Sequence, residues 1–144
     1  MENNRLVKLF LVDDDSVYLK LLEIEFLQYP NIVVRTFATG ELCIDNLSDE
    51  PDAIVLDYHL DGIEKHAING IQTLDKIKKY SEQIPVIMLS SQDQIDVAID
   101  CMHHHAQDYV VKGETAFMRL KNIIFRILDI KKLENELTWY MDRM

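Results

Sequence analysis

Short apolar runs alternate along the chain with longer stretches in which apolar residues recur every three or four positions. A compact apolar run that ends abruptly in polar residues is typical of a strand buried on both faces of a sheet. The pattern predicts five such strands, at Leu9–Val12, Val33–Phe37, Ala53–Leu56, Pro85–Leu89 and Tyr109–Val111.

Helical periodicity fills the segments between these runs. Thr39 is placed to cap a short second helix, and helical spacing resumes only after a polar segment over residues 58–69, which we expect to be a long loop. Ser91 and Gln94 have the spacing of a capping box, which predicts a helix from about Gln92 to Met102.

The last segment, residues 114–144, contains neither glycine nor proline and is predicted to be helical throughout. Strands that alternate with helices form βαβ units, and right-handed crossovers then place helices on both faces of a parallel sheet. No linker composition or repeat interrupts this pattern. We therefore expect one α/β domain, doubly wound around a five-stranded parallel sheet.

Composition and charge narrow the classes of partner. The chain has 144 residues, of which 48% are apolar and 28% charged, as in an ordinary globular protein. Its 25 acidic residues outnumber 15 basic ones, so the formal net charge is -10. An acidic surface repels phosphate backbones and anionic lipid, so we expect no direct binding to nucleic acid or membrane. Divalent cations and basic protein surfaces are the expected partners.

Cysteine placement and the amino-terminal sequence indicate a compartment. Cys43 and Cys101 are isolated within apolar stretches, which predicts reduced thiols in the core. The opening residues MENNRLVKLF lack the apolar run and cleavage site of a signal peptide, and no stretch is long enough for a membrane span. A cytoplasmic protein is expected.

Polar residues that follow the predicted strands carry the chemistry, because ligands of open α/β sheets bind beyond the carboxyl ends of the strands. Several of these residues are aspartates, and clustered carboxylates favour a hard cation such as Mg²⁺. A carboxylate can also attack phosphorus to form an aspartyl-phosphate. Taken singly, Asp15 and Ser91 are better interpreted as helix caps and Lys112 as a surface charge. The residues at these strand ends are Asp13, Asp14, Asp15, Asp57, Ser90, Ser91 and Lys112.

These motifs together resemble a bacterial response-regulator receiver domain. Leu11-Val12-Asp13-Asp14-Asp15-Ser16 looks like the opening of that family, and three later motifs follow in the family's order. The resemblance covers roughly residues 6–128 and implies a flavodoxin-like fold with strand order 2-1-3-4-5. The later motifs are Ile54-Val55-Leu56-Asp57, Pro85-Val86-Ile87-Met88-Leu89-Ser90 and Asp108-Tyr109-Val110-Val111-Lys112.

The resemblance implies a role for each matching residue. Asp57 matches the aspartate that accepts a phosphoryl group from a histidine kinase or a histidine phosphotransfer protein. Asp57 also matches a ligand of Mg²⁺ (or Mn²⁺), together with Asp13, Asp14 and the backbone carbonyl of His59. Ser90 and Lys112 match the hydroxyl and ammonium that contact the phosphoryl group, and Tyr109 matches the aromatic switch residue. Such a protein is a signalling switch that catalyses only its own phosphorylation and dephosphorylation, rather than an enzyme.

Four positions differ from the family's usual pattern. Gly113 follows the lysine where a proline after a cis bond is common, and the loop over residues 61–68 is longer than usual. Asp61 in that loop stands where proline is typical, His105 stands where glycine is frequent, and Ser90 replaces the commoner threonine. None of these differences removes a residue that the resemblance assigns to phosphorylation.

The carboxyl-terminal segment extends beyond a receiver's usual last helix. We expect residues 1–128 to form the receiver domain and residues 129–144 a helical extension, with no output domain in the sequence. Leu133, Leu137, Tyr140 and Met144 follow coiled-coil spacing, which predicts a homodimer through this helix; a helix packed back on its own domain and a frayed tail are the alternatives. The chain is then a stand-alone receiver or the receiver part of a longer protein.

Three other interpretations stay open at this point. His103–His105 could bind a metal, although adjacent helical residues point in different directions and the run is better interpreted as a helix end. Asp13-Asp14-Asp15-Ser16-Val17 also fits the nucleophile motif of haloacid-dehalogenase-like phosphatases, with Asp13 as nucleophile and Asp15 as general acid. A receiver-shaped interaction module that does not depend on phosphorylation is the third.

Overall fold

The computed structural model describes residues 6–62, 66–91 and 93–144, and within them strands and helices alternate as predicted. The strands are β1 (Val7–Val12), β2 (Ile32–Phe37), β3 (Ala53–Asp57), β4 (Val86–Ser90) and β5 (Asp108–Val111). The helices are α1 (Ser16–Phe26), α2 (Gly40–Asp45), the 3₁₀ turn η1 (Leu47–Asp49), α3 (Gly70–Tyr80), α4 (Ile95–His103) and α5 (Ala116–Asp142).

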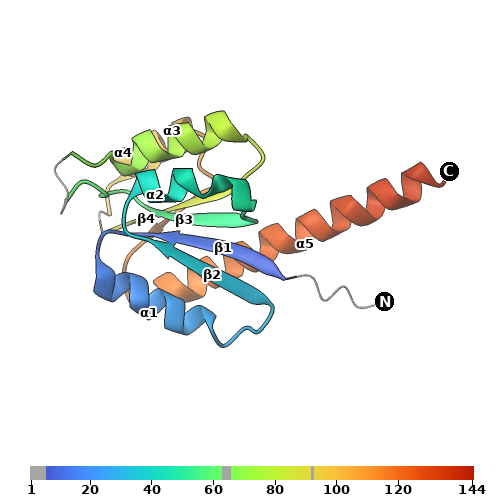
Figure 1. Cartoon of the computed structure of the whole chain (residues 1–144), viewed down its shortest axis with the longest axis horizontal. Coiled ribbons are helices and arrows are strands. Elements are labelled where there is room, and N and C mark those ends of the chain that lie inside the picture. Colours follow the sequence, from blue (N-terminus) through green and yellow to red (C-terminus); the bar gives the residue numbers. More distant parts are fainter. Residues whose placement is uncertain (1–5, 63–65, 92) are drawn as a thin grey trace.

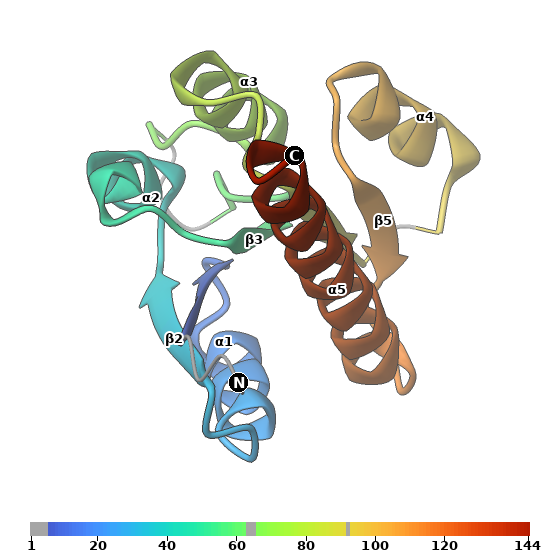
Figure 2. The same ribbon diagram turned by 90° about the vertical axis from the view of Figure 1, so that its right-hand side faces the viewer.

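The five strands form one parallel sheet in the order β2-β1-β3-β4-β5. Helices α1 and α5 cover one face of this sheet, and α2, α3 and α4 cover the other (Figures 1 and 2). The flavodoxin-like, doubly wound fold that the sequence indicated is confirmed. Its strand order reverses between β1 and β3, so the rim beside these two strands is where such folds bind ligands.

Two apolar clusters fill the space on either side of the sheet. Along β1, Phe10 and Val12 point into the cluster under α2, α3 and α4, whereas Leu9 and Leu11 point into the cluster under α1 and α5. All four side chains are buried, as expected for a strand with helices on both faces. Burial of every strand at the centre of the sheet gives the carboxyl-end residues a rigid support.

The two thiols lie where the sequence placed them. Cys43 and Cys101 are free, fully buried and part of the cluster under α2, α3 and α4. Burial raises the pKa of Cys43 to about 12 and that of Cys101 to about 11, so both thiols stay protonated at neutral pH.

The start of α4 was predicted wrongly. The helix begins at Ile95, with Gln94 as an N-cap residue that makes no side-chain capping bond, so Ser91 does not open a capping box. The predicted first residue of the helix, Gln92, lies outside the described residues. The other expected caps are present: Asp15 accepts hydrogen bonds at the start of α1, and Thr39 accepts one from the backbone N–H of Leu42.

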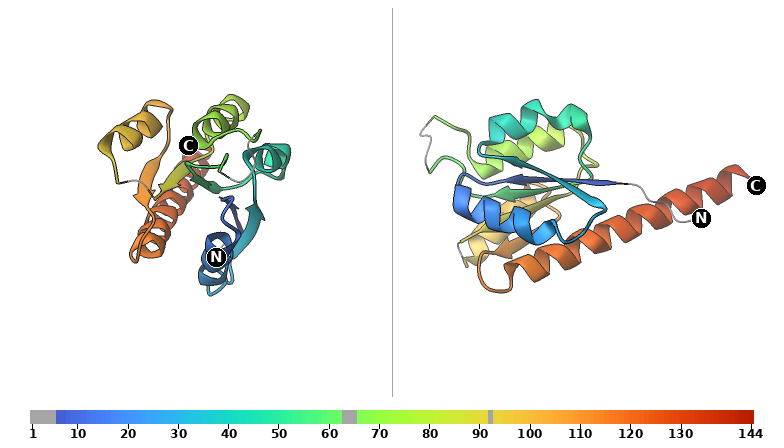
Figure 3. Two further views of the ribbon diagram at one scale, coloured as in Figure 1. Left: turned by 90° about the vertical axis from the view of Figure 1, so that its left-hand side faces the viewer. Right: turned by 60° about the horizontal axis from the view of Figure 1, so that its bottom comes forward.

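Helix α5 continues well beyond the sheet (Figures 1 and 3). It runs without interruption to Asp142, and Leu133 and Leu137 on its distal part are 63% and 61% exposed. Lys131, at the start of the extension, still contacts the domain through a hydrogen bond from its Nζ to the Asp52 carbonyl at 2.8 Å, whereas residues 132–144 are exposed. No helix in the described part of the chain is both long and apolar enough to cross a membrane.

Candidate functional site

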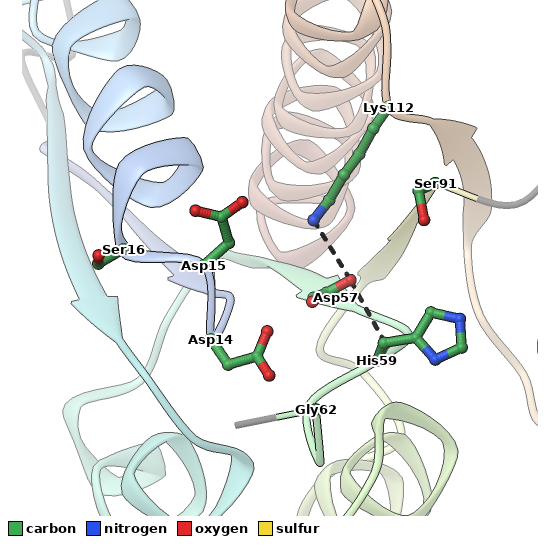
Figure 4. A pocket seen from close by; sticks show the side chains of 8 residues that line it. All are labelled: Asp14, Asp15, Ser16, Asp57, His59, Gly62, Ser91 and Lys112. Carbon is green, nitrogen blue, oxygen red and sulfur yellow. Dashed lines mark hydrogen bonds and ion pairs between the residues drawn. The ribbon is translucent and has the colours of Figure 1, made fainter. Parts of the chain in front are cut away.

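Three strand ends bring carboxylates and an ammonium to one rim of the sheet. Asp13 and Asp14 follow β1, Asp57 is the last residue of β3, and Lys112 follows β5 directly. Parallel pairing places the ends of β1 and β3 side by side, because Val12, the last residue of β1, is paired with Leu56, which precedes Asp57. The sequence predicted this meeting of four groups, and the structure brings them together. Figure 4 shows three of them, Asp14, Asp57 and Lys112.

The segment after β1 is fixed by its own backbone bonds. The buried Asp13 carboxylate accepts a hydrogen bond from the backbone N–H of Asp15 at 2.9 Å. Asp15 in turn accepts bonds from the backbone N–H groups of Val17 and Tyr18, both at 3.1 Å. Asp15 is thus occupied as the cap of α1, whereas the phosphatase interpretation needs it as a general acid.

Lys112 lies between two buried carboxylates. Its Nζ is 2.9 Å from Asp13 Oδ2 and 3.6 Å from Asp57 Oδ1. Asp57 is 3% exposed and also accepts a hydrogen bond from the backbone N–H of His59 at 3.4 Å. One ammonium therefore compensates two carboxylates that are largely removed from water.

The protonation of Asp57 reflects this imbalance. Burial and the nearby Asp13 carboxylate raise the pKa of Asp57 to about 8, although the Lys112 ammonium acts in the opposite direction. Burial alone would lower the pKa of Lys112, but the hydrogen bond with Asp13 and the negative charges of Asp57 and Asp13 raise it above its ordinary value. Lys112 therefore stays charged, and its single positive charge cannot compensate both carboxylates.

The donor set fits a divalent cation. One carboxylate oxygen from each of Asp13, Asp14 and Asp57 lies within 4.8 Å of the other two. Hard cations such as Mg²⁺ prefer oxygen ligands, and a cation here would supply the positive charge that the buried carboxylates lack. The acidic triad is compatible with the divalent metal site typical of receiver domains. Among the described residues, none of the histidines at positions 103–105 belongs to a candidate metal cluster.

A pocket of about 450 Å³ opens above the carboxylates. Asp57 forms part of its floor, Lys112 reaches down into it from β5, and Asp14 lies on the opposite side (Figure 4). The pocket is open to solvent from above, which leaves the Asp57 carboxylate within reach of an incoming group. Its lining residues are Asp14, Asp15, Ser16, Asp57, His59, Gly62, Ser91 and Lys112.

Two residues that the resemblance singled out lie beside this pocket rather than in its lining. Ser90 is fully buried at the end of β4, and its backbone carbonyl accepts a hydrogen bond from the Lys112 N–H at 2.8 Å. Tyr109 is half-buried and packs against the cluster under α2, α3 and α4. Ser90 directly precedes the lining residue Ser91, and Tyr109 lies three residues before the lining residue Lys112.

Sequence reasoning missed some of the lining residues. Ser91 was assigned to a helix cap, yet it lines the pocket, as do Ser16 and Gly62. The strand-end signal had already placed Ser91 at this rim, because it directly follows Ser90, the last residue of β4. Within the long loop, residues 63–65 lie outside the described residues. The described peptide bonds include none in the cis conformation, and that between Lys112 and Gly113 is among them.

Curated relatives share the receiver-like part of this chain. Regulatory protein LuxO of Vibrio cholerae is 27% identical over 124 residues, which cover 85% of this chain and 26% of that protein. A protein-glutamate methylesterase/protein-glutamine glutaminase of Bacillus licheniformis is 35% identical over 107 residues, or 71% of this chain and 28% of the relative. The chain thus spans about a quarter of the length of these relatives.

Solved structures show the same fold. The BeF3-activated receiver domain of DrrB, a Thermotoga maritima protein, is 29% identical with a TM-score of 0.66, covering 83% of this chain and 97% of that one. The receiver domain of a LuxO repressor protein from Vibrio parahaemolyticus has a TM-score of 0.78 at 22% identity, covering 92% and 97%.

The family comparison agrees with the site. Residues 9–124 match the family described as response regulator receiver domain, which is most of the chain. The matched segment contains the acidic triad Asp13, Asp14 and Asp57 together with Lys112, the set typical of a phosphoacceptor site. Receiver domains are typically non-enzymatic signalling switches whose partner is a histidine kinase. This chain therefore belongs to the response regulator receiver domain family.

Proposed function

We propose that Asp57 is the residue that accepts the phosphoryl group. The observation that carries this proposal is the position of its carboxylate on the pocket floor, with the Lys112 ammonium 3.6 Å away and Asp13 and Asp14 within ligand distance of a shared ion. Asp13 is less suited to the role because its Oδ1 accepts the Asp15 N–H and its Oδ2 lies 2.9 Å from Lys112 Nζ.

The transfer needs one bond made and one broken. An oxygen of the Asp57 carboxylate attacks phosphorus while the bond from phosphorus to the imidazole nitrogen of a phosphohistidine breaks, and the electron pair of that bond remains on the nitrogen. The product is an acyl phosphate at Asp57. Lys112 stays positively charged and interacts with an oxygen of the transferred group, which the pair with Asp13 already favours by holding the ammonium in place.

Mg²⁺, or Mn²⁺ in its place, is the expected cofactor. Asp13, Asp14 and Asp57 would hold it, and the backbone carbonyl of His59 would be a further ligand. A divalent cation held there would neutralise charge on the phosphoryl oxygens.

Phosphorylation would act on the rest of the domain through Ser90 and Tyr109. Ser90 is buried directly behind the pocket, bonded through its backbone to Lys112, so a move of its hydroxyl toward the phosphoryl group alters packing at the end of β4. Tyr109 lies on the neighbouring strand and is half-buried, and it would turn further inward when Ser90 moves. The phosphoryl group on Asp57 then favours one of two packings of the same domain.

The partner and the arrangement of the chain complete the proposal. A histidine kinase or a histidine phosphotransfer protein supplies the phosphoryl group in the cytoplasm. Residues 1–128 act as the receiver, and residues 129–144 act as a signalling helix or as the seam of a homodimer, because their apolar side chains are exposed on a continuous helix.

Intact mass after incubation with Mg²⁺ and acetyl phosphate tests the phosphoacceptor. We expect one phosphoryl adduct on the wild type and none on Asp57→Asn, while Asp13→Asn loses rate but retains the adduct at long times. Loss of the adduct in Asp13→Asn with retention in Asp57→Asn would favour the phosphatase interpretation. Absence of any adduct on folded wild-type protein would favour the phosphorylation-independent module.

A further inference from the structure

An aromatic ring lies beside the ammonium of Lys112, in addition to the two carboxylates. The Lys112 Nζ lies 4.6 Å from the centroid of the Tyr18 ring, a distance typical of a cation–π contact. The same atom is 2.9 Å from Asp13 Oδ2 and 3.6 Å from Asp57 Oδ1. Two carboxylates and one ring face thus contact the charge, and they come from the residue after β1, the end of β3 and the first turn of α1.

Tyr18 is held firmly in this place. Its backbone N–H donates to the Asp15 carboxylate at 3.1 Å, which fixes it in the first turn of α1. Its ring is half-buried against the apolar cluster under α1 and α5. Burial raises the pKa of the Tyr18 phenol above its ordinary value, although Lys112 lowers it, so the ring stays neutral at neutral pH.

A lysine side chain must be restrained by its neighbours if its ammonium is to stay directed at one group. Its four-carbon stem has many rotamers, and an ammonium is strongly hydrated, so an uncovered lysine spends much of its time extended into water. Here the Lys112 side chain is only 18% exposed, although it follows the last strand at an open rim. The ring attracts the cation through its face and excludes water from one side of it.

We infer that Tyr18 is a positioning residue for the phosphoryl transfer, acting through Lys112 by keeping the ammonium directed at the Asp57 carboxylate. This inference rests on the proposed function, because it assigns Tyr18 to the reaction at Asp57. The ring carries the effect, since the cation–π contact involves its face and the phenol is uncharged.

Replacement of the ring gives the kinetic test. With acetyl phosphate and Mg²⁺ as donor and cofactor, we expect Tyr18→Leu to slow the initial rate of adduct formation by about fivefold, the size of a partly desolvated cation–π contact. Tyr18→Phe keeps the ring and should remain close to the wild-type rate. Tyr80→Leu, at an exposed tyrosine on α3, is the matched control and should leave the rate unchanged.

A spectroscopic test on unphosphorylated protein is independent of that reaction. A ring face over the ammonium shifts the NMR signals of the Lys112 Cε protons upfield, and this shift should appear in wild type and Tyr18→Phe and be absent in Tyr18→Leu. The upfield shift can be measured on the wild-type protein alone. The contact therefore stays testable even if Tyr18→Leu does not fold.

The experiments distinguish an error in the role of Tyr18 from an error in the proposed function of Asp57. Unshifted Lys112 signals in the wild type, or equal phosphorylation rates in folded Tyr18→Leu and wild type, would overturn the role of Tyr18 while leaving Asp57 as acceptor. An equal loss of rate in Tyr18→Phe and Tyr18→Leu would also overturn it, because the ring would then not be the active feature. Lack of any adduct on the wild type would instead contradict the proposed function.

Discussion

At the scale of single residues, Asp57 is a carboxylate whose charge the folded protein disfavours. It is 3% exposed and lies beside another buried carboxylate, and these two features raise its pKa to about 8 from an ordinary value of 3.8. A nucleophilic carboxylate must be deprotonated, so the site is poised to react once a cation offsets the repulsion. Cation binding should therefore release a proton near neutral pH.

The raised pKa of Asp57 predicts a pH dependence of stability. Between about pH 4 and pH 8 the folded protein keeps a proton at Asp57 that the unfolded chain releases, so the free energy of unfolding falls as the pH rises through this window. In EDTA, the free energy of unfolding measured with urea should fall more for the wild type than for Asp57→Asn between the two ends of the window, by at most about 5 kcal/mol.

Divalent cation supplies the control for that measurement. With Mg²⁺ present, the carboxylate is ionised in the folded state and the excess loss in the wild type should shrink. The account of Asp57 would be wrong if wild type and Asp57→Asn had the same pH dependence in EDTA.

Gly70 and Gly113 offer a matched pair of substitutions near the site. A Cβ at Gly70 would lie 2.5 Å from the backbone oxygen of Asp57 and 2.7 Å from Tyr58 Cα, whereas a Cβ at Gly113 meets nothing within 4 Å. Gly70→Ala should therefore destabilise the domain by about 2 kcal/mol, because backbone next to the acceptor must shift. Gly113→Ala should stay within about 0.5 kcal/mol of the wild type.

Urea denaturation of both alanine variants checks this prediction, with the phosphorylation rate as a second readout. Gly70→Ala should slow adduct formation through displacement of Asp57. Equal stability of the two variants would mean that the close approach of α3 to the end of β3 is relaxed without cost.

At the scale of secondary-structure elements, a histidine links α3 to the end of α4. His104 Nδ1 lies 2.7 Å from Asp75 Oδ1 on α3, and its Nε2 lies 3.5 Å from Asp100 Oδ1 one turn back on α4. The hydrogen bond with Asp75 raises the pKa of His104, with a smaller opposing effect of burial and further support from the charges of Asp75 and Asp100. The charged form of this histidine thus ties two helices together.

This pair predicts a second loss of stability with rising pH, which begins near pH 6.5 and overlaps the upper part of the Asp57 window. Because the folded pKa of His104 is raised, its contribution is complete below the unfolded value of 6.5 and is lost as the pH rises through the folded value. Asp75→Asn should cost a few tenths of a kcal/mol at low pH and less at high pH, since the pair is partly exposed. Asp129→Asn, at an exposed position on α5, is the control; equal pH profiles for the two variants would refute the link.

Most of the secondary-structure elements could be predicted from the sequence. Strands buried on both faces leave a continuous apolar signature, so all five runs were located within one or two residues. The start of α4 was missed because Gln94 makes no side-chain cap bond and Ser91 instead faces the pocket. Strand-end carboxylates and Lys112 were predictable from the topology, whereas the Tyr18 ring over Lys112 depends on how α1 packs, which spacing alone does not encode.

At the scale of the whole molecule, α5 joins the receiver to an exposed apolar surface. Its 27 residues span roughly 40 Å at the usual rise, so the distal part lies beyond the sheet (Figure 3). Leu133, Leu137 and Tyr140 are 63%, 61% and 63% exposed there. Such a surface favours contact with a second copy of the helix.

Self-association through this seam is testable with charge-matched variants. Sedimentation velocity of the 144-residue chain should show a dimer for the wild type, and Leu133→Glu should weaken it by about tenfold or more in Kd, because a charge then lies in the seam. Asn135→Glu adds the same charge to the same helix outside the seam and should leave the dimer intact. A monomeric wild type, or equal weakening by both variants, would contradict a homodimer through α5.

The most direct test of the central claim is the location of the phosphoryl group in the chain. Borohydride reduces an acyl phosphate to an alcohol, so an aspartyl-phosphate is converted to homoserine and can be located by peptide mass spectrometry. After treatment with Mg²⁺ and acetyl phosphate, we predict homoserine at position 57 and unmodified aspartate at positions 13 and 14. Homoserine at position 13, with Asp57 unmodified, would contradict the account.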